Sequence, residues 1–397
     1  MKYAVITPTF EPHFQFIEKY LESYKKFVID KENVTLLFTI SKDEEKVFKK
    51  ITDKYCDSVQ YEILFFEDIL QHFNINLTPN ELLKKYKKFS FQTLKKFYTM
   101  LYSDADRFLV LDSESMWVRK TNMKDLFENF FHLPFIVGSS ISSRDLVSNF
   151  TQGVNDNVNF LLGKNCDKWF LENFVWFYDK KILNDLFDEY GSPIEMAERV
   201  YSLKDEQKRE SGIFEIELYQ AYLYHNNDKY NYTVLDVDNL LKNNLSPKLL
   251  QKYFEDYNNH FEGNCGFFEH TMLLLNDANW KILAKIFKKY HFNIIRCDYS
   301  TLGNIKLQEK FMDIVQPNIL AASQEHAFGI NDRFETLVNK NKYSVKLEKH
   351  LFHLTHPKKI TLQLFIEPIS VIFYGIKYLL RKQKNIRKYK KLYDCKQ

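Results

Sequence analysis

The sequence predicts an α/β protein built on a doubly wound sheet of parallel strands, with a C-terminal part that is rich in helices. Two observations support this fold class. In the first third of the 397-residue chain, short apolar runs alternate with segments whose apolar residues recur at helical spacing, which is the pattern of parallel strands joined by helices. Hydrophobic residues make up 45% of the chain and include 36 Phe and 25 Tyr, so a large core can form and a disordered chain is excluded.

The strands and helices of this first third follow one another in a regular order. Tyr3–Thr7 is an apolar run ended by Pro8, which favours a buried parallel strand. Phe14–Val28 carries apolar residues at helical spacing, which predicts a helix packed on the sheet. Ligands of such sheets bind beyond the carboxyl ends of the strands, so we expect the functional site there. Further strands are expected at Val34–Ile40, Gln60–Phe66 and Arg107–Leu111, and further helices at Asp43–Tyr55 and Leu82–Ser103.

The rest of the chain is less regular. Residues 130–245 form a mixed region with aromatic-rich pieces, in which a helix is expected around Glu217–His225. Beyond this region we expect helices at Pro247–Tyr257 and Trp280–Tyr290, and a strand at Asn293–Cys297.

Several function classes are disfavoured by what the sequence lacks. It contains no P-loop, no G-x-G-x-x-G, no H-E-x-x-H and no G-x-S-x-G motif, which weakens the cases for a P-loop NTPase, a Rossmann dehydrogenase, a zincin and an α/β-hydrolase. The net charge of +4 argues against a dedicated nucleic-acid binder. The charge is uneven, however, because the residues from Lys377 onward include nine Lys or Arg and one Asp.

The most informative residues lie on the expected fourth strand and on the helix before it. The helix carries Gln92 and Lys96 one turn apart, with Lys95 beside them, and the strand ends at Asp112, followed by Ser113 and Glu114. If the chain stays extended there, alternation places the carboxylates of Asp112 and Glu114 on one side. Both could then reach one Mg²⁺ or Mn²⁺ ion, which proteins hold with one or two carboxylates plus substrate phosphates.

These segments resemble a known family. The N-terminal VITPTFEPH, the helix with Gln and Lys, and VLDSES are similar to GT-A type nucleotide-sugar glycosyltransferases, whose sheet is Rossmann-like. More narrowly, they resemble bacterial capsule and lipopolysaccharide transferases in which a strand ends in an LDSD-like motif. FEIELY at Phe214–Tyr219 resembles an acidic segment in the acceptor half of the same group. The resemblance covers roughly residues 1–240 in patches, and it departs from the pattern at Glu114, where the family has Asp, and at Phe214, where it often has Ser.

The resemblance implies roles on the donor side of the site. Asp112 and Glu114 would hold Mn²⁺ or Mg²⁺ together with the donor diphosphate, and Lys96, or Lys95 in its place, would contact a phosphate. The residues expected to line the donor are Thr7, Pro8, Thr9 and Gln92.

The remaining candidates are two acidic residues on the acceptor side and two histidines. Glu215 or Glu217 would deprotonate the acceptor hydroxyl if the enzyme inverts the anomeric centre, although acids at this point also suit the start of a helix. His326 is a weaker candidate to complete the metal site, and His13, near the end of the first strand, is weaker still.

The resemblance also implies an organisation and a function. Residues 1–130 would bind the nucleotide sugar, residues 131–330 would bind the acceptor within the same catalytic domain, and residues 331–397 would form a basic, amphipathic tail. The expected function is metal-dependent transfer of a sugar from a nucleotide-sugar donor to a growing bacterial surface glycan or a lipid-linked precursor. The alternatives are a nucleotidyltransferase of similar fold, disfavoured because no Gly follows the first strand before His13, and a non-catalytic glycan-assembly protein beside the membrane.

The expected location is the cytoplasm, at the inner face of the cytoplasmic membrane. The five Cys are scattered and the N-terminus lacks the apolar stretch of a signal peptide. Ile360–Leu380 is long enough to span a bilayer but is interrupted by polar and charged residues. A helix after Pro368 would collect its apolar residues on one face, followed by the basic segment Arg381–Lys391, so we expect it to lie on an anionic membrane surface. The alternative is a terminal helix that packs on the catalytic domain.

Overall fold

The computed structural model describes most of the first 251 residues and several shorter segments after them. His326 and most of the C-terminal tail, for which the sequence predicts specific roles, lie outside the described residues. The described ranges are 1–140, 149–170, 176–251, 277–296, 313–321, 372–373, 375–377 and 379–380.

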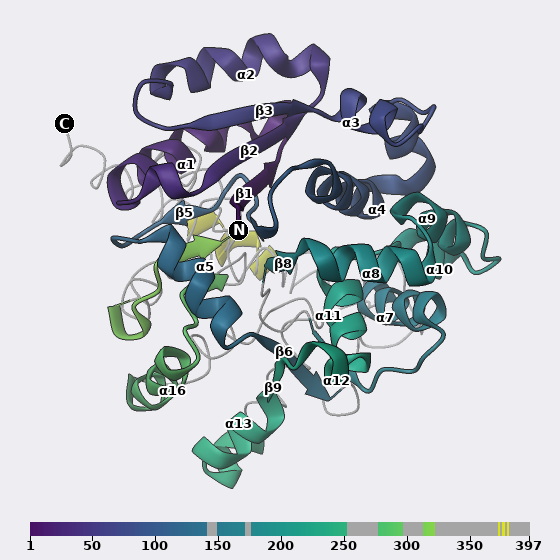
Figure 1. Cartoon of the computed structure of the whole chain (residues 1–397). Coiled ribbons are helices and arrows are strands. Elements are labelled where there is room, and N and C mark those ends of the chain that lie inside the picture. The colour runs from purple at the N-terminus through teal and green to yellow at the C-terminus, as the bar shows by residue number, and fades with distance from the viewer. Residues whose placement is uncertain are drawn as a thin grey trace.

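A five-stranded sheet with the order β3-β2-β1-β4-β8 is the main sheet of the protein (Figure 1). Strands β1 to β4 run parallel, and β8 joins antiparallel to β4. The predicted α/β class with a parallel sheet is therefore confirmed, and β1 lies at its centre. The strands are β1 (Tyr3–Pro8), β2 (Thr35–Ile40), β3 (Tyr61–Phe65), β4 (Arg107–Val110) and β8 (Phe177–Asp179).

The three predicted helices between these strands are present, with differences at their ends, and the short helix at Phe66–His72 was not predicted. Helix α4 starts three residues before the predicted Leu82, because Thr78 and Glu81 form a capping box in which each satisfies a backbone N–H of the other. The expected third strand is one residue shorter at its end, because Phe66 begins helix α3. The helices are α1 (Phe14–Phe27), α2 (Glu45–Thr52), α3 (Phe66–His72) and α4 (Pro79–Tyr102).

Helix α4 contains one residue with a strained backbone. Lys87 has φ 60° and ψ 176°, a combination that interrupts the helical geometry and that essentially only glycine adopts without strain. We expect Lys87→Gly to raise the unfolding free energy by about 1 kcal/mol, measured by thermal melting. Lys88→Gly is the matched control, because Lys88 is exposed in the same helix without this backbone conformation, and there Gly should cost about 1 kcal/mol. A loss of stability in Lys87→Gly would contradict the expectation.

Two smaller three-stranded sheets accompany the main sheet. In one of them β6 pairs parallel with β9 and antiparallel with β7, and in the other β11 lies between β10 and β5. The strand predicted at Asn293–Cys297 is present as β10, and the helix predicted at Glu217–His225 is present as α11. The strands are β5 (Met116–Trp117), β6 (Phe135–Ser140), β7 (Lys168–Trp169), β9 (Thr233–Asp236), β10 (Ile294–Arg296) and β11 (Ile319–Ala321). The helices are α5 (Met123–His132), α7 (Asn149–Leu162), α8 (Lys180–Tyr190), α9 (Pro193–Tyr201), α10 (Glu206–Ser211), α11 (Glu215–His225), α12 (Asn227–Tyr230), α13 (Val237–Asn244) and α16 (Asp277–Lys289).

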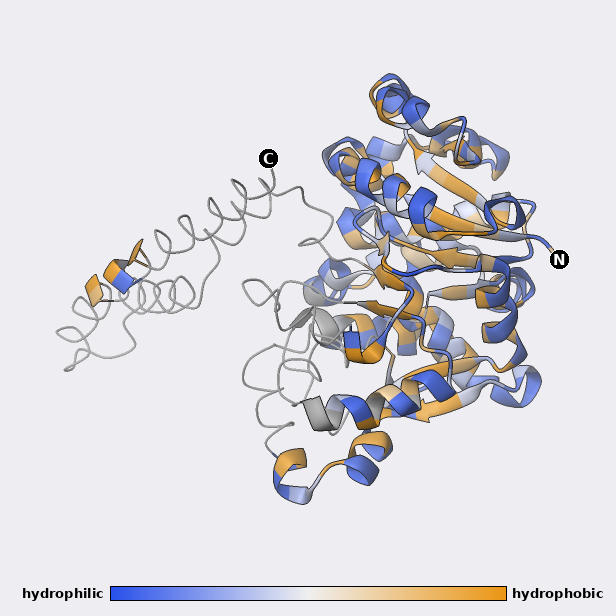
Figure 2. Ribbon diagram, turned by 90° about the vertical axis from the view of Figure 1, so that its left-hand side faces the viewer, coloured by the Kyte–Doolittle hydropathy of each residue, from blue (hydrophilic) through white to orange (hydrophobic). Residues whose placement is uncertain are grey.

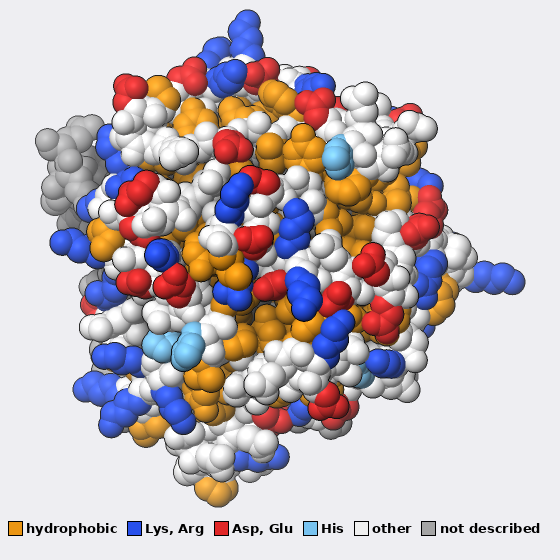
Figure 3. Space-filling view, viewed as in Figure 1, with side chains coloured by type: hydrophobic (Ala, Val, Ile, Leu, Met, Phe, Trp, Pro, Cys, Tyr) orange, Lys and Arg blue, Asp and Glu red, His pale blue; other side chains and the backbone are white. Residues whose placement is uncertain are grey.

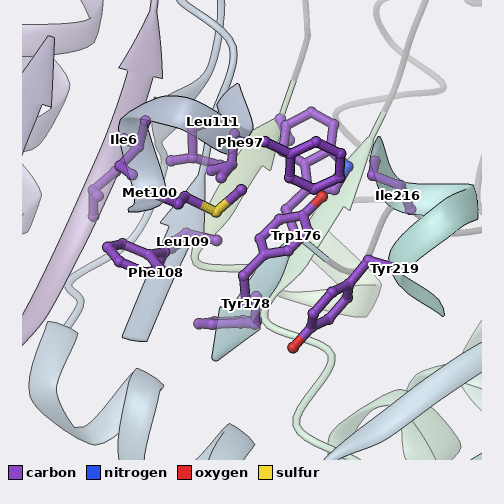
Figure 4. Packing of buried hydrophobic residues seen from close by; sticks show 14 of the residues in the cluster. Ile6, Phe97, Met100, Phe108, Leu109, Leu111, Trp176, Tyr178, Ile216 and Tyr219 are labelled. Carbon is purple, nitrogen blue, oxygen red and sulfur yellow. The ribbon is translucent and has the colours of Figure 1, made fainter. Parts of the chain in front are cut away.

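One continuous set of buried apolar side chains runs through these elements. Figure 2 shows the hydrophobic residues concentrated in the strands and the hydrophilic ones on the outer helices. Figure 4 shows the part of the core where β4, β8, α4 and α11 meet, with Trp176 and Tyr178 near Tyr219. Tyr178 and Tyr219 pack with their ring centroids 4.7 Å apart. The core therefore ties the start of α11 to the main sheet.

Two properties of the structure concern the predicted membrane contact: the distribution of charged side chains on the surface, and the length and apolar character of the helices. Acidic and basic side chains are interspersed on the face seen in Figure 3. Among the helices of the described ranges, none is long and apolar enough to cross a bilayer.

Candidate functional site

The carboxyl ends of β1 and β4 lie side by side, because Ile6 pairs with Val110 and the Leu111 N–H donates to the Ile6 carbonyl. The residues that follow each strand, Thr7–Thr9 and Asp112–Ser115, are therefore neighbours. Helix α4 packs against β1, and its Lys95 reaches the Thr9 carbonyl just beyond the end of that strand. The sequence prediction of a site beyond these strand ends thus corresponds to a real convergence of polar residues.

The side chains at the end of β1 are turned into the protein. Thr7 and Thr9 are both buried. The Thr7 hydroxyl donates to the Tyr20 hydroxyl at 2.8 Å, and the Thr9 N–H donates to the Thr39 carbonyl at 3.0 Å. Pro8 between them is half-buried. Of these three residues Pro8 is the one that solvent reaches, so the predicted contact of the Thr7 and Thr9 side chains with the donor stays a prediction.

Lys95 supports the end of β1 from helix α4. Its buried ammonium donates to the Thr9 carbonyl at 2.8 Å. Burial lowers the pKa of Lys95 to about 8, although the nearby carboxylates of Glu44 and Glu67 oppose that shift. Gln92, one turn earlier on α4, is half-buried. Lys95 is therefore a buried cation with one main-chain partner among the residues that the structure describes.

This burial gives Lys95 a testable pH dependence. Because its folded pKa of about 8 lies below its ordinary value of 10.5, the unfolded chain binds more protons between pH 8 and pH 10.5, and stability rises with pH across that window. Lys95→Met removes this titration. We therefore expect the unfolding free energy of the wild type, relative to Lys95→Met, to rise by about 3 kcal/mol from pH 7 to pH 10.5. A difference that stays constant across this range in denaturant titrations would contradict the assignment.

Lys96, one residue further on, makes two ion pairs. Its ammonium lies 2.6 Å from Glu215 Oε1 and 3.3 Å from Asp112 Oδ1. The side chain of Lys96 is 11% exposed and that of Glu215 is 3% exposed, whereas that of Asp112 is 36% exposed. Burial alone lowers the pKa of Lys96, but Asp112 and Glu215 together raise it above its ordinary value. Lys96 therefore stays charged, and Asp112 is the member of this cluster that solvent reaches.

The chain after β4 turns, and this corrects the expectation of an extended Asp112–Glu114 segment. The Ser115 N–H donates to the Asp112 carbonyl at 3.0 Å and closes a tight turn. Glu114 consequently faces another set of partners. Its Oε2 accepts from the Ser113 hydroxyl at 3.0 Å and lies 3.5 Å from His13 Nδ1. Alternation along a strand therefore does not apply here, and Asp112 pairs with Lys96 while Glu114 pairs with His13.

The two acids of the FEIELY segment begin helix α11 and are both buried. Each oxygen of Glu215 accepts from a side chain of α4, Oε1 from Lys96 and Oε2 from Thr93 at 2.9 Å. Glu217 Oε2 accepts the Phe170 N–H at 2.9 Å. Glu215 thus belongs to the cluster around Asp112, and Glu217 holds the backbone after β7.

Sequence reasoning did not find every residue of this cluster. Thr93 and Ser113 were not singled out, although Thr93 precedes Lys96 by three residues and so shares its helix face. His13 was only a weak candidate, yet it lies beside Ser113 and Glu114. The signal for His13 is its place five residues after the end of β1, which is a neighbour of β4.

The side chains that the structure describes do not by themselves form a complete metal cage. Within the described ranges there is no group of three or more His, Cys, Asp or Glu residues that could hold an ion. His326 lies outside those ranges. A site that depends on substrate phosphates needs fewer protein ligands, so the carboxylates of Asp112 and Glu114 remain the predicted ones.

Comparisons with known proteins give no family. No model of a known protein family matches the chain, and no curated protein matches it. The solved structures that match include mouse xyloside xylosyltransferase 1 in its apo form, with a TM-score of 0.35 and 11% sequence identity, over 66% of this chain and 94% of the mouse chain. At this TM-score the similarity carries no argument, and the function has to be inferred from the residues of the chain itself.

Proposed function

We propose that this protein is a metal-dependent glycosyltransferase of the GT-A type, which moves a sugar from a nucleotide-sugar donor to a growing bacterial capsule or lipopolysaccharide glycan. The observation that carries the proposal is the partly exposed carboxylate of Asp112 at the carboxyl end of β4, next to the end of β1 and to Lys96. This is the place where α/β sheets bind ligands. The sequence motifs at the same positions supply the reaction class.

The charges of the site support a dependence on a divalent cation. Three carboxylates, those of Asp112, Glu114 and Glu215, are set against the two ammonium groups of Lys95 and Lys96. A nucleoside diphosphate is itself an anion and is repelled by this negative balance. A divalent cation offsets the repulsion, and hard cations such as Mg²⁺ and Mn²⁺ prefer carboxylate and phosphate oxygens.

The residues fit such an ion as a site that the substrate completes. Asp112 Oδ1 faces Lys96, and in the described part of the chain no hydrogen-bond donor contacts its other carboxylate oxygen, so Asp112 can offer that oxygen as a ligand. In our proposal Glu114 is the second ligand, and the ion stabilises the negative charge that develops on the departing diphosphate. Lys95 holds the backbone of Thr9, next to which the nucleotide would bind, and Gln92 lies one turn before Lys96 on the same helix face.

The acceptor side of the proposal involves the start of α11. Of the two candidate bases, Glu215 belongs to the cluster with Asp112, whereas Glu217 is engaged by the backbone of Phe170. We therefore place Glu215 in the reaction site and give Glu217 a structural role. In this position the Glu215 carboxylate could act as the general base of an inverting mechanism. It could instead hold Lys96 and Thr93 in place without taking part in proton transfer.

Calorimetric titration tests this function. UDP, GDP and CMP are titrated into the full chain, with Mn²⁺ and with excess EDTA. We expect one of these nucleotides to bind with Mn²⁺ and to lose at least tenfold in affinity with EDTA, because the negative site needs the cation. A protein that binds none of them under either condition is not the proposed enzyme, and equal binding in EDTA would contradict the metal dependence.

We also propose that the C-terminal tail attaches the protein to the inner face of the cytoplasmic membrane, where a lipid-linked acceptor would be found. The described residues of the tail support this, because its large apolar side chains are 49–63% exposed. A basic segment follows them in the sequence, and each basic residue near anionic lipid contributes about 1 kcal/mol. The exposed apolar residues are Ile372, Phe373, Ile376, Leu379 and Leu380.

Cosedimentation with anionic liposomes tests the membrane contact. The intact chain should pellet with the vesicles at low salt and detach as the salt is raised. Ile372→Asp/Ile376→Asp should remain in the supernatant, because it removes part of the apolar face. Ile282→Asp is the control, since Ile282 is 41% exposed on α16. If the intact chain stays in the supernatant at low salt, the attachment proposal is wrong.

A further inference from the structure

We propose that Lys96 is a positioning residue that joins Asp112 to Glu215, and that it is not a ligand of the donor phosphates. The inference rests on the proposed function only where it concerns the donor. It reassigns the lysine that the sequence motif places on the diphosphate.

The ammonium of Lys96 is already occupied by carboxylates. It lies 2.6 Å from Glu215 Oε1 and 3.3 Å from Asp112 Oδ1. Two of its three N–H donors are thereby used, and a phosphate that took the place of either carboxylate would leave that carboxylate without its cation in a largely buried site. Removing one partner from a buried ion pair is strongly destabilising, so the existing pairs disfavour a direct contact with phosphate.

The cluster links three segments that are far apart in the sequence. Lys96 lies on α4, Asp112 follows β4, and Glu215 begins α11. Thr93 holds the second oxygen of Glu215, so Glu215 is fixed to one face of α4 by two donors. Within the described ranges the ion-pair partner of Asp112 is Lys96, and the Asp112 side chain is partly exposed to solvent. Because Lys96 contacts both carboxylates, the fixed position of Glu215 sets the position of the Asp112 carboxylate through Lys96.

The neighbouring lysine provides the contrast. Lys95 is equally buried, but it donates to the Thr9 carbonyl and forms no ion pair with the described carboxylates. It can therefore serve as a matched control, because it is a buried lysine on the same helix that is not part of the carboxylate cluster.

A double-mutant cycle on stability tests the link without any substrate. Lys96→Met and Glu215→Gln should each lower the melting temperature, and the double variant should lose clearly less than the sum of the two losses, because each change removes the partner of the other. Lys95→Met combined with Glu215→Gln should give additive losses. Additive losses for the Lys96 pair would overturn the inference. This cycle decides it even if no nucleotide sugar turns out to be a substrate.

A kinetic measurement then separates positioning from phosphate binding. With a donor that the enzyme accepts, and with Mn²⁺ at saturation so that the metal site stays filled even with a displaced Asp112, Lys96→Met should lower kcat at least tenfold while the donor KM stays within about twofold, because a misplaced Asp112 then acts mainly in the transition state. Lys96→Arg keeps the charge and should recover part of kcat. A donor KM that rises at least tenfold, with kcat little changed, would show that Lys96 binds the donor and would overturn the inference.

Discussion

Asp112→Asn is expected to lower sugar transfer at least 100-fold while the fold stays intact. The change removes the charge of the one carboxylate in the Lys96 cluster that solvent reaches, with a side chain 36% exposed. The loss of a metal ligand that stabilises the departing diphosphate costs several kcal/mol of transition-state stabilisation. Because Asn is nearly isosteric with Asp, and because the residue is partly exposed, the melting temperature should change little.

The matched control lies at the other end of the same strand. Asp104 precedes β4, is 80% exposed and pairs with Lys2 on the surface. Asp104→Asn should leave transfer and nucleotide binding unchanged, because a surface ion pair contributes little. Wild-type activity in Asp112→Asn, or an equal loss in both variants, would contradict the role of Asp112.

Gly212→Ala is expected to lower the unfolding free energy by about 2–4 kcal/mol and to reduce activity as well. Gly212 has φ 65°, and an added Cβ would lie 2.3 Å from the hydroxyl of Ser90. That hydroxyl accepts the Ile213 N–H at 3.0 Å, and the Ile213 carbonyl accepts from Thr93 at 2.8 Å. The substitution therefore combines backbone strain with a lost buried hydrogen bond, and it disturbs the segment that leads directly to Glu215.

Gly163 is the control for the strain alone. It has a similar φ of 62°, but nothing lies within 4 Å of the position of an added Cβ. Gly163→Ala should therefore cost only about 1 kcal/mol and leave activity unchanged. Equal melting temperatures for Gly212→Ala and Gly163→Ala would show that the contact with Ser90 does not position this segment.

The sequence could predict the elements whose signals are local. The apolar run that ends at Pro8 marks β1, and the run before Asp112 marks β4, because buried parallel strands read as continuous apolar segments. Strand β8 was not predicted, because Phe177–Asp179 has only three residues in an aromatic-rich stretch and is a strand only by pairing with β4. Such pairing depends on contacts that no local pattern records.

In the candidate site, too, contacts between residues close in the sequence could be predicted, and contacts between distant residues could not. The approach of Lys96 to Asp112 followed from a helix that immediately precedes a strand in the chain. The contact of Lys96 with Glu215, 119 residues further on, could not be read from spacing. The turn at Asp112–Ser115 has a local signal in the sequence. Asp and Ser favour turns through their side-chain hydrogen bonds. The expectation of an extended chain through Asp112–Glu114 was wrong for that reason.

The most direct test of the central claim is nucleotide release from a set of UDP-, GDP- and CMP-linked sugars, with the full chain in Mn²⁺ and in excess EDTA. The proposed function predicts turnover of at least one donor with Mn²⁺, no turnover in EDTA, and recovery when Mn²⁺ is restored, because the cation offsets the negative balance of Asp112, Glu114 and Glu215. Turnover that is undiminished in EDTA, or no turnover of any of these donors with Mn²⁺, would contradict it.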